Sequence, residues 1–476
     1  MLPPDLNSSN PTPQTGAIPP VVAPQSPVLP PTVGEGSPKS MKKILAIAGG
    51  FLAIVIVILL AVSFFLSRNK AVEQKDEVEL VWWGLWEDTS IIEPIIKEYE
   101  ESHPKTKIKY TVQSKEDYRE RLTSALASGT GPDIFRLHNT WVPMFARSLT
   151  PLPASIMSAQ EFGSTFYPVA GKDLTISTGI VGIPLEFDGM AMFINEELFT
   201  TFALTPPKTW DEFKVTAKAL TITNKAGEIE QAGAAVGFST NIDHWEDIVA
   251  LIYLQNGADL ALQREDRAQG ALTFYTDLGR VGKVWDESLP PSTIAFAGGN
   301  VAIYFGPSWR VFDIQKLNPN LDFRILPMPQ ILKEEKEPDI MYASYWFEGV
   351  SNKSQGQAQA WDFLKFMSSK ESLEKLYANA SKTRAFGEPY SRVDMRELLL
   401  SDPMVGPFLE LAPTAQSWYL ASKTFDGETG INSQLSTYFN DAVTEMVRGG
   451  DINRASNNLD KGVAQVMKQY GITVKK

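Results

Sequence analysis

Residues 77–83 read EVELVWW, an alternating stretch that becomes fully apolar, as the sequence of a buried β-strand does. Residues 91–101 (IIEPIIKEYEE) follow with apolar side chains at helical spacing, and residues 107–112 (KIKYTV) have the pattern of a second strand. A strand, a helix and a strand in such close succession form a βαβ unit, which places parallel strands in one sheet. The stretch therefore predicts an α/β fold with helices packed on a parallel sheet.

The same unit then repeats. Residues 117–128 (DYRERLTSALAS) carry a helical apolar stripe, Gly129 is a natural helix end, and residues 133–137 (DIFRL) read as the next strand. A chain of 476 residues is too long for one hydrophobic core, so we expect two lobes. Further helices are predicted at 210–220, 245–255, 360–368 and 435–447, and further strands at 301–305 and 323–326.

Composition excludes several classes of site. The chain has no cysteine, which removes disulfides, thiolate metal sites and thiol nucleophiles. Its three histidines, His103, His138 and His244, are far apart in the sequence, so we expect no metal site and no other cofactor. The net charge of −12 opposes binding to phosphate backbones, so nucleic acid is not an expected partner.

Residues 44–66 (ILAIAGGFLAIVIVILLAVSFFL) form an uncharged apolar run, long enough to cross a bilayer core of about 30 Å as a helix. A cleaved signal peptide is the alternative, because Ala61-Val62-Ser63 resembles a cleavage site. The run continues past that site, which favours an uncleaved transmembrane anchor. Residues 1–40 are proline-rich and predicted to be disordered or polyproline-like, and residues 67–76 read as a polar tether.

Several motifs occur in a fixed order after the tether. They are 80–86 (LVWWGLW), 126–134 (LASGTGPDI), 182–184 (GIP), 193–199 (FINEELF), 206–213 (PPKTWDEF), 299–309 (GNVAIYFGPSW) and 360–366 (AWDFLKF). Together they resemble the extracellular solute-binding proteins of family 1, the maltose-binding-protein-like receptors of ABC sugar importers. The resemblance runs from about residue 77 to the C-terminus. Two departures, the missing lipid-attachment cysteine and Asn300-Val301-Ala302 after Gly299, leave the mode of anchoring open.

This resemblance implies a type II periplasmic-binding-protein-like fold with a ligand cleft between two lobes. The lobes would comprise about 77–187 with 345–395, and about 188–344 with 396–476. It also implies a monomer that captures a sugar or oligosaccharide and delivers it to the permease subunits of an ABC transporter. Together with the apolar run, it favours a single-pass cell-membrane protein that has its tail inside and its solute-binding domain outside.

A sugar site needs aromatic platforms for the apolar ring faces and carboxylates or amides for the hydroxyls. Trp86 and Glu87 directly follow the first strand, and Asn139 and Trp141 follow the strand of the second unit, where α/β folds place ligands. The resemblance adds further ligand candidates, namely Asp188, Trp309, Tyr345, Trp346 and Trp418. Packing in the core is the alternative for each ring, and we expect Trp82 to lie in the core.

Two rival functions stay open. A tethered sensory or adhesion module would bind the same ligands without feeding a transporter. A glycoside hydrolase would need two carboxylates at a defined separation, which the sequence does not identify. There is no Gly-x-Ser-x-Gly elbow, and we expect no Ser-His-Asp arrangement from three scattered histidines. We therefore predict a binding protein and not an enzyme.

Overall fold

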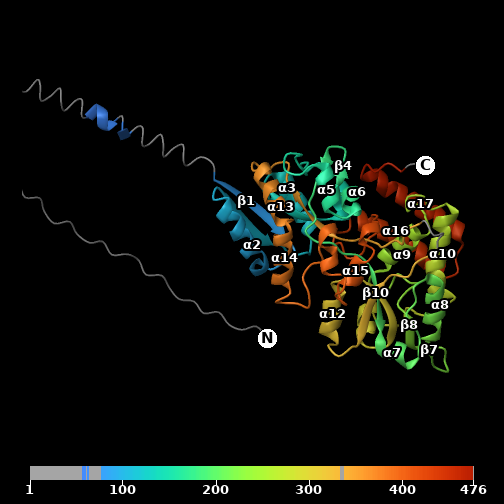
Figure 1. Ribbon diagram of the computed structural model, residues 1–476. Helices are drawn as coiled ribbons and strands as arrows, with labels where there is room; N and C mark the ends of the chain where they lie inside the picture. The colour runs from blue at the N-terminus through green and yellow to red at the C-terminus, as the bar shows by residue number, and fades with distance from the viewer. Residues whose placement is uncertain (1–55, 61, 64–76, 333–336, 475–476) are drawn as a thin grey trace, which may run out of the picture. The chain divides into compact units, whose positions relative to one another are not determined.

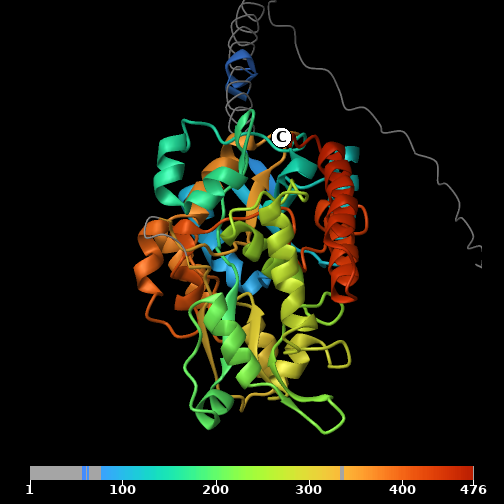
Figure 2. The ribbon, with the colours of Figure 1, turned by 90° about the vertical axis from the view of Figure 1, so that its right-hand side faces the viewer.

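Two β-sheets form the core of residues 77–474, and helices pack against both (Figures 1 and 2). The structure is a computed structural model that describes residues 56–60, 62–63, 77–332 and 337–474. The element boundaries confirm the helices and strands predicted from the sequence to within a few residues.

The first sheet contains four strands in the order β11, β3, β1, β2. These strands are β1 (Val78–Gly84), β2 (Thr106–Val112), β3 (Ile134–His138) and β11 (Trp346–Val350). β1 pairs in parallel with β2 and β3, which confirms the βαβ prediction, whereas β11 is antiparallel to β3. A strand from much later in the chain thus completes this sheet.

Four helices accompany the first sheet: α2 (Thr89–Ser102), α3 (Tyr118–Ser128), α13 (Gln357–Met367) and α14 (Lys370–Ala380). α2 begins at Asp88, whose side chain accepts a hydrogen bond from Ser90 N. α3 ends at Gly129, whose φ of +78° is the left-handed conformation that glycine adopts without strain. α14 packs directly against α2, so late and early parts of the chain share this layer (Figure 1).

The second sheet contains five strands in the order β10, β6, β9, β8, β7. They are β6 (Ala191–Asn195), β7 (Ile222–Thr223), β8 (Ile229–Ala234), β9 (Val301–Gly306) and β10 (Phe323–Pro327). Only β8 and β9 pair in parallel within it, and its other strand pairs are antiparallel, in contrast to the parallel β1, β2 and β3 of the first sheet. For example, β6 starts beside the end of β9, with Ala191 opposite Gly306, and the two strands run in opposite directions.

Six helices belong to the same part of the chain: α7 (Glu196–Thr201), α8 (Trp210–Ala219), α9 (Trp245–Gln255), α10 (Asp266–Arg280), α11 (Ser292–Ala297) and α12 (Arg310–Leu317). α8 begins with a capping box in which the side chains of Thr209 and Glu212 each bond the other residue's backbone N–H. This local bonding explains why TWDE starts a helix here.

The remaining elements are short or C-terminal. They are α4 (Val142–Phe145), α5 (Ala159–Thr165), α6 (Pro168–Asp173), β4 (Thr175–Ile176), β5 (Gly179–Ile180), α15 (Gly406–Leu409), α16 (Ile431–Val447), α17 (Ile452–Gln469), and the 3-10 turns η1 (Asn139–Trp141), η2 (Val393–Leu398) and η3 (Ala412–Thr414). α16 and α17 pack against each other and against α10 (Figure 2).

Three segments cross between the two sheets and hydrogen-bond to one another. Met190 N donates to Tyr342 O at 3.0 Å, and Ala343 N donates to Gln416 O at 2.8 Å. Ser344 N also donates to Asp188 O at 3.1 Å. The protein thus has a two-lobed α/β fold of the periplasmic-binding-protein type, and the lobe boundaries given above remain a prediction.

The apolar segment 44–66 lies outside the described residues except for 56–60 and 62–63, which are helical. Among the described residues, none of the helices combines the length and the apolar character needed to cross a bilayer. The proline-rich tail at 1–40 and the tether at 67–76 also lie outside the described residues.

Candidate ligand-binding site

A cavity of about 630 Å³ lies where the strands of both sheets end and the chain crosses between them. Trp86 and His138 reach it from the ends of β1 and β3, and Trp346 from the start of β11. Asp188 lines it from the first crossing segment, and Trp309 from the turn between β9 and α12. The structure thus brings four of the candidate residues, Trp86, Asp188, Trp309 and Trp346, to one cavity.

One wall of the cavity is aromatic. Trp86 meets Trp346 edge to face at 5.6 Å between ring centroids, and Phe425 lies 6.3 Å from Trp86. Trp86 remains 37% exposed, so a ring face is available to a ligand. Lys115 Nζ lies 4.6 Å above the Phe425 ring, which places a positive charge beside this wall.

Trp309 stands at another part of the cavity wall and is also 37% exposed. The guanidinium of Arg310 stacks on its ring at 4.3 Å, and His244 approaches it edge-on at 5.5 Å. These two contacts hold the ring in place while it remains partly open. A ring that is held by neighbours and still accessible suits a stacking platform.

Asp188 is buried, and both of its carboxylate oxygens accept hydrogen bonds. Oδ1 accepts from Gly189 N at 2.8 Å and from Ser308 N at 3.1 Å, and Oδ2 accepts from Ser308 Oγ at 2.9 Å. Burial raises the pKa of Asp188 to about 7, although these hydrogen bonds oppose the increase. Asp188 thus fixes the backbone of the turn that precedes Trp309. It also lines the cavity.

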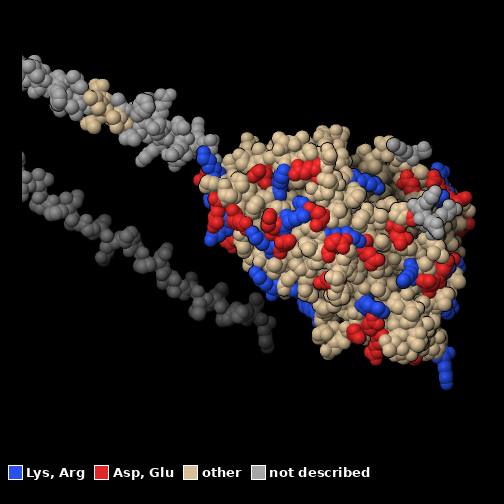
Figure 3. Space-filling model, viewed as in Figure 1, with Lys and Arg blue, Asp and Glu red and all other residues tan. Residues whose placement is uncertain are grey.

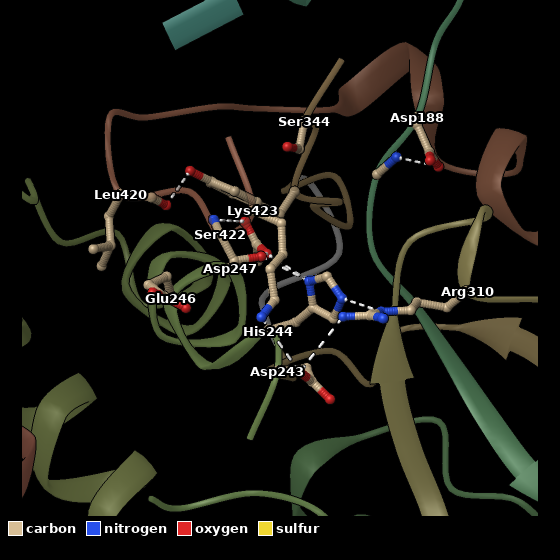
Figure 4. Close-up of polar contacts among 12 residues, drawn as sticks. Asp188, Asp243, His244, Glu246, Asp247, Arg310, Ser344, Leu420, Ser422 and Lys423 are labelled. Atoms are coloured by element: carbon tan, nitrogen blue, oxygen red, sulfur yellow. Dashed lines mark hydrogen bonds and ion pairs between the residues drawn. The ribbon is translucent and has the colours of Figure 1, made fainter. Parts of the chain in front are cut away.

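His244 is the centre of a buried polar network (Figure 4). Arg310 Nε donates to His244 Nε2 at 2.8 Å, and His244 Nδ1 lies 2.7 Å from Ser422 Oγ. Ser422 Oγ in turn donates to Asp247, and Arg310 Nη1 pairs with Asp313 at 2.8 Å. Burial, and less strongly the charge of Arg310, lower the pKa of His244, so the ring is neutral.

This network corrects the expectation that no serine, histidine and aspartate would meet. Ser422, His244 and Asp247 do meet, from segments far apart in the sequence. However, the donor Arg310 occupies the Nε2 lone pair, so the neutral ring carries its proton on Nδ1. The ring therefore has no free lone pair with which to take a proton from Ser422, whose hydroxyl already donates to Asp247.

Asp243 is negatively charged and lines the cavity next to His244. Burial alone would raise its pKa, but hydrogen bonds from Thr293 and the charges of Arg310 and Lys423 bring it down to about 2. Lys423 Nζ lies 3.4 Å from Asp243. The cavity therefore presents fixed charges of both signs beside its aromatic rings.

Two carboxyl groups, those of the buried Glu186 and the half-buried Glu388, line the cavity. Burial, together with the charge of Glu388, raises the pKa of Glu186 well above its usual range. Burial would also raise the pKa of Glu388, but the Arg384 guanidinium at 2.6 Å holds it below its usual range. Glu186 therefore keeps its proton and donates it in a hydrogen bond to Glu388.

Glu87, another candidate, lies behind this surface and not on it. Its side chain is 1% exposed and pairs through Oε2 with Arg136, which also pairs with Glu348 at 2.7 Å. Trp82, predicted to be a core residue, is fully buried and donates to Glu348 through its indole N–H. Glu87 therefore lies outside the cavity wall.

The other four candidates also lie away from the cavity surface. Asn139 donates to Asp173 at 2.9 Å, and Tyr345 OH donates to the same carboxylate at 3.1 Å. Trp141 is fully buried and stacks between Tyr118 and Phe145. Asn139 and Trp141 follow β3, and Tyr345 precedes β11. All three side chains are buried within the fold.

Trp418 is partly buried and packs against Tyr419 and Phe439 of α16. Asp133, which the sequence placed at the head of a strand, accepts hydrogen bonds from Val81 N of β1 and from Ser354 Oγ, and so joins β1 to the loop before α13. Neither residue belongs to the cavity wall.

Sequence reasoning missed several wall residues. Arg310 and Glu186 adjoin candidates in the sequence and could have been found from their neighbours. Lys423 and Phe425 lie in a C-terminal loop with φ of +52° and +56°, a strained conformation that no sequence pattern revealed. Arg384 and its partner Glu388 are distant in the sequence from the other wall residues, and only the tertiary fold brings them to the cavity.

Relatives with known ligands share this fold. The chain is 21% identical over 312 residues to a maltotriose-binding protein of Pyrococcus abyssi, covering 63% of this chain and 64% of the relative. It is 22% identical over 251 residues to a diacetylchitobiose-binding protein of Streptomyces coelicolor, covering 49% of this chain and 57% of the relative. The chain therefore spans less than two thirds of the length of either relative.

A solved structure, the cyclic α-maltosyl-1,6-maltose-binding protein of Arthrobacter globiformis, superposes with a TM-score of 0.65 at 18% identity. The alignment covers 82% of this chain and 99% of that protein, which supports the two-lobed fold. A profile of bacterial extracellular solute-binding proteins matches residues 83–374. This match spans more than half of the chain and includes all of β3, β9 and β11 and the end of β1, and the chain belongs to the bacterial extracellular solute-binding protein family.

Proposed function

We propose that this chain captures a carbohydrate outside the cell and presents it to an ABC importer. The observation that carries the proposal is the cavity between the two lobes, which combines the partly open rings of Trp86 and Trp309 with buried carboxyls. Aromatic rings stack on the apolar faces of sugars, and carboxyls bond sugar hydroxyls. A volume of about 630 Å³ lies within the usual range for small-molecule sites.

The relatives support the ligand class. The names of the two sequence relatives and the solved structure all specify a di- or oligosaccharide. Identity near 20% does not transfer the ligand itself, so the proposal stops at a sugar or oligosaccharide. We propose Trp86, Trp309 and Trp346 as its stacking surfaces and Asp188 as a polar contact.

A thermal-shift screen tests this proposal. The purified full-length chain would be heated with maltooligosaccharides, chitooligosaccharides, mannooligosaccharides and their monosaccharides, each from micromolar to millimolar concentration. A ligand that binds the folded state raises stability by RT ln(1 + [L]/Kd), so a true ligand gives a saturable increase in Tm. Calorimetric titration then measures the affinity. If none of these sugars binds while a solute of another class does, the carbohydrate assignment is wrong.

We further propose that residues 44–66 anchor the protein in the cell membrane, with the solute-binding domain outside and the proline-rich tail inside. The apolar sequence of this segment supports the anchor. Protease added to intact cells should remove the domain and spare an N-terminal tag. Release of the tagged protein into the medium, or protection of the domain, would contradict this topology.

We also propose that a monomer docks on the permease subunits of its importer. On the face shown in Figure 3, acidic and basic side chains of the domain are interspersed, a pattern that favours solubility. Reconstituting the chain with the permease and ATPase subunits of its importer should yield sugar-dependent ATP hydrolysis. A neighbouring sensor kinase that responds to the sugar, with no such hydrolysis, would support the sensory alternative.

A further inference from the structure

Three carboxyl groups converge beneath the floor of the cavity. One carboxylate oxygen from each of Glu87, Glu186 and Glu388 lies within 4.8 Å of the other two. They come from the loop after β1, the segment before the first crossing and the loop after α14. A spacing of this size lets one ion contact all three oxygens at 2.0–2.6 Å.

One oxygen of each of these carboxyl groups accepts a hydrogen bond from a fixed donor. Glu87 Oε2 accepts from Arg136, Glu388 Oε1 from Arg384 at 2.6 Å, and Glu186 Oε1 from Trp346 N at 3.2 Å. These donors fix the orientation of the three carboxyl groups in the manner of the outer shell around a metal site.

Glu87 Oε1 provides an independent indication of a missing ligand. This oxygen is buried and has no hydrogen-bond partner, although its side chain is only 1% exposed. An unpaired carboxylate oxygen in the interior is costly, because it has lost its water without gaining a donor or a cation.

The charges around the three carboxyls point to the same kind of ligand. Four carboxyl groups, those of Glu87, Glu186, Glu348 and Glu388, face only two guanidinium groups, those of Arg136 and Arg384. An ion that displaces the proton shared by Glu186 and Glu388 would leave four carboxylates facing these two guanidinium groups, and two further positive charges would balance this set, because buried charges require partners. A single divalent cation supplies them.

We propose that Glu87, Glu186 and Glu388 form a binding site for one oxygen-preferring divalent cation of the Ca²⁺, Mg²⁺ or Mn²⁺ class. Carboxylate oxygens are the ligands that these ions prefer, and among the described residues neither histidine nor cysteine belongs to the site. Because Glu186 and Glu388 also line the cavity, water there can complete the coordination of the ion. The ion would determine the charge of the part of the cavity wall that Glu186 and Glu388 form, where the solute binds.

Direct ion titration tests this site without any sugar. The full-length chain, stripped with a chelator and exchanged into chelator-free buffer, would be titrated separately with CaCl₂, MgCl₂ and MnCl₂ by calorimetry and thermal unfolding. We expect one saturable site for at least one ion and an increase in Tm that follows its occupancy. Tb³⁺, which has similar ligand preferences, should show tryptophan-sensitised emission, since Trp346 adjoins Glu186.

Glu186→Gln is the critical variant, because it removes a carboxylate ligand that the ion would bind but keeps a side-chain oxygen for Trp346 N and disrupts no arginine pair. We expect the ion affinity to fall at least tenfold. Glu246→Gln is the control: it changes a half-buried glutamate, which bonds Ser436 and lies outside the cavity wall, and should leave ion binding unchanged.

The proposal is overturned if the wild-type chain binds none of the three ions at millimolar concentration, or if Glu186→Gln and wild type bind an ion equally. Circular dichroism establishes whether Glu186→Gln folds, and Glu388→Gln serves as a second variant if it does not. Because no sugar is used, this outcome is independent of the carbohydrate proposal.

Discussion

Asp188 binds Ser308 through three hydrogen bonds, two from the backbone N–H and one from the hydroxyl. Asp188 lies in the first crossing segment, and Ser308 immediately precedes Trp309, whose ring lines the cavity. The contact therefore fixes a cavity ring to the segment that joins the two lobes. A change at Asp188 should alter both ligand binding and stability.

The first prediction concerns this contact. Asp188→Asn replaces an accepting oxygen by an NH₂ group that faces the donors of Ser308, so we expect a loss of about 1–3 kcal/mol in stability and roughly tenfold weaker sugar binding. Urea unfolding and calorimetric titration measure the two effects. Ser308→Ala, which removes only the hydroxyl, should cost about 1 kcal/mol. Unchanged stability and affinity in Asp188→Asn would contradict an anchoring role.

The second prediction separates a ligand platform from a core ring. Trp309→Ala should weaken binding of the sugar found in the screen by about 1–3 kcal/mol, because a partly open stacking surface is lost. Its urea midpoint should change little. Trp361 is fully buried, so Trp361→Ala should instead cost about 3–5 kcal/mol of stability. The platform role fails if Trp309→Ala binds the sugar as wild type does.

The third prediction concerns the buried ion pairs. Arg136→Met leaves two fully buried carboxylates, Glu87 and Glu348, without their cation, and should destabilise the fold by about 3–5 kcal/mol. The exposed pair between Lys375 and Glu98 is the control, and Lys375→Met should change stability by less than about 1 kcal/mol. Urea unfolding at pH 7 compares the two variants, and similar losses would argue against this difference.

The fourth prediction concerns pH. Burial, with a smaller contribution from the charge of Asp247, raises the pKa of Glu246 from 4.5 to about 7. The folded state therefore binds the proton more tightly than the unfolded state, so the contribution of Glu246 to stability is full below pH 4.5 and declines as the pH rises through 7. Glu246→Gln should remove this decline.

The free energy of unfolding, measured in urea between pH 4.5 and 8, gives the difference between wild type and Glu246→Gln. Glu397→Gln is the control, because that side chain is 80% exposed. A difference between wild type and Glu246→Gln that stays constant across this pH range would show that Glu246 titrates normally.

Local pattern was sufficient for most of the secondary structure. The strand at 77–83 and the helix at 210–220 were predicted correctly because apolar spacing, turn glycines and capping residues act within a few residues of the chain. Trp86 could be selected as a candidate because it follows a strand end, and Trp309 because its motif resembles that of the family. The order of the motifs also indicated the family and the two-lobed fold.

The tertiary structure decided which candidates face the cavity. Asn139 and Trp141 follow a strand just as Trp86 does, yet Asn139 bonds Asp173 and Trp141 packs against Tyr118, both from more distant parts of the chain. The meeting of His244 with Ser422, and of Glu87 with Glu186 and Glu388, joins residues with no local relationship in the sequence. The sequence alone thus determined the elements and the residue types available to the site, because those depend on near neighbours. Only the packing of distant segments decided burial, charge pairing and which side chains share the cavity.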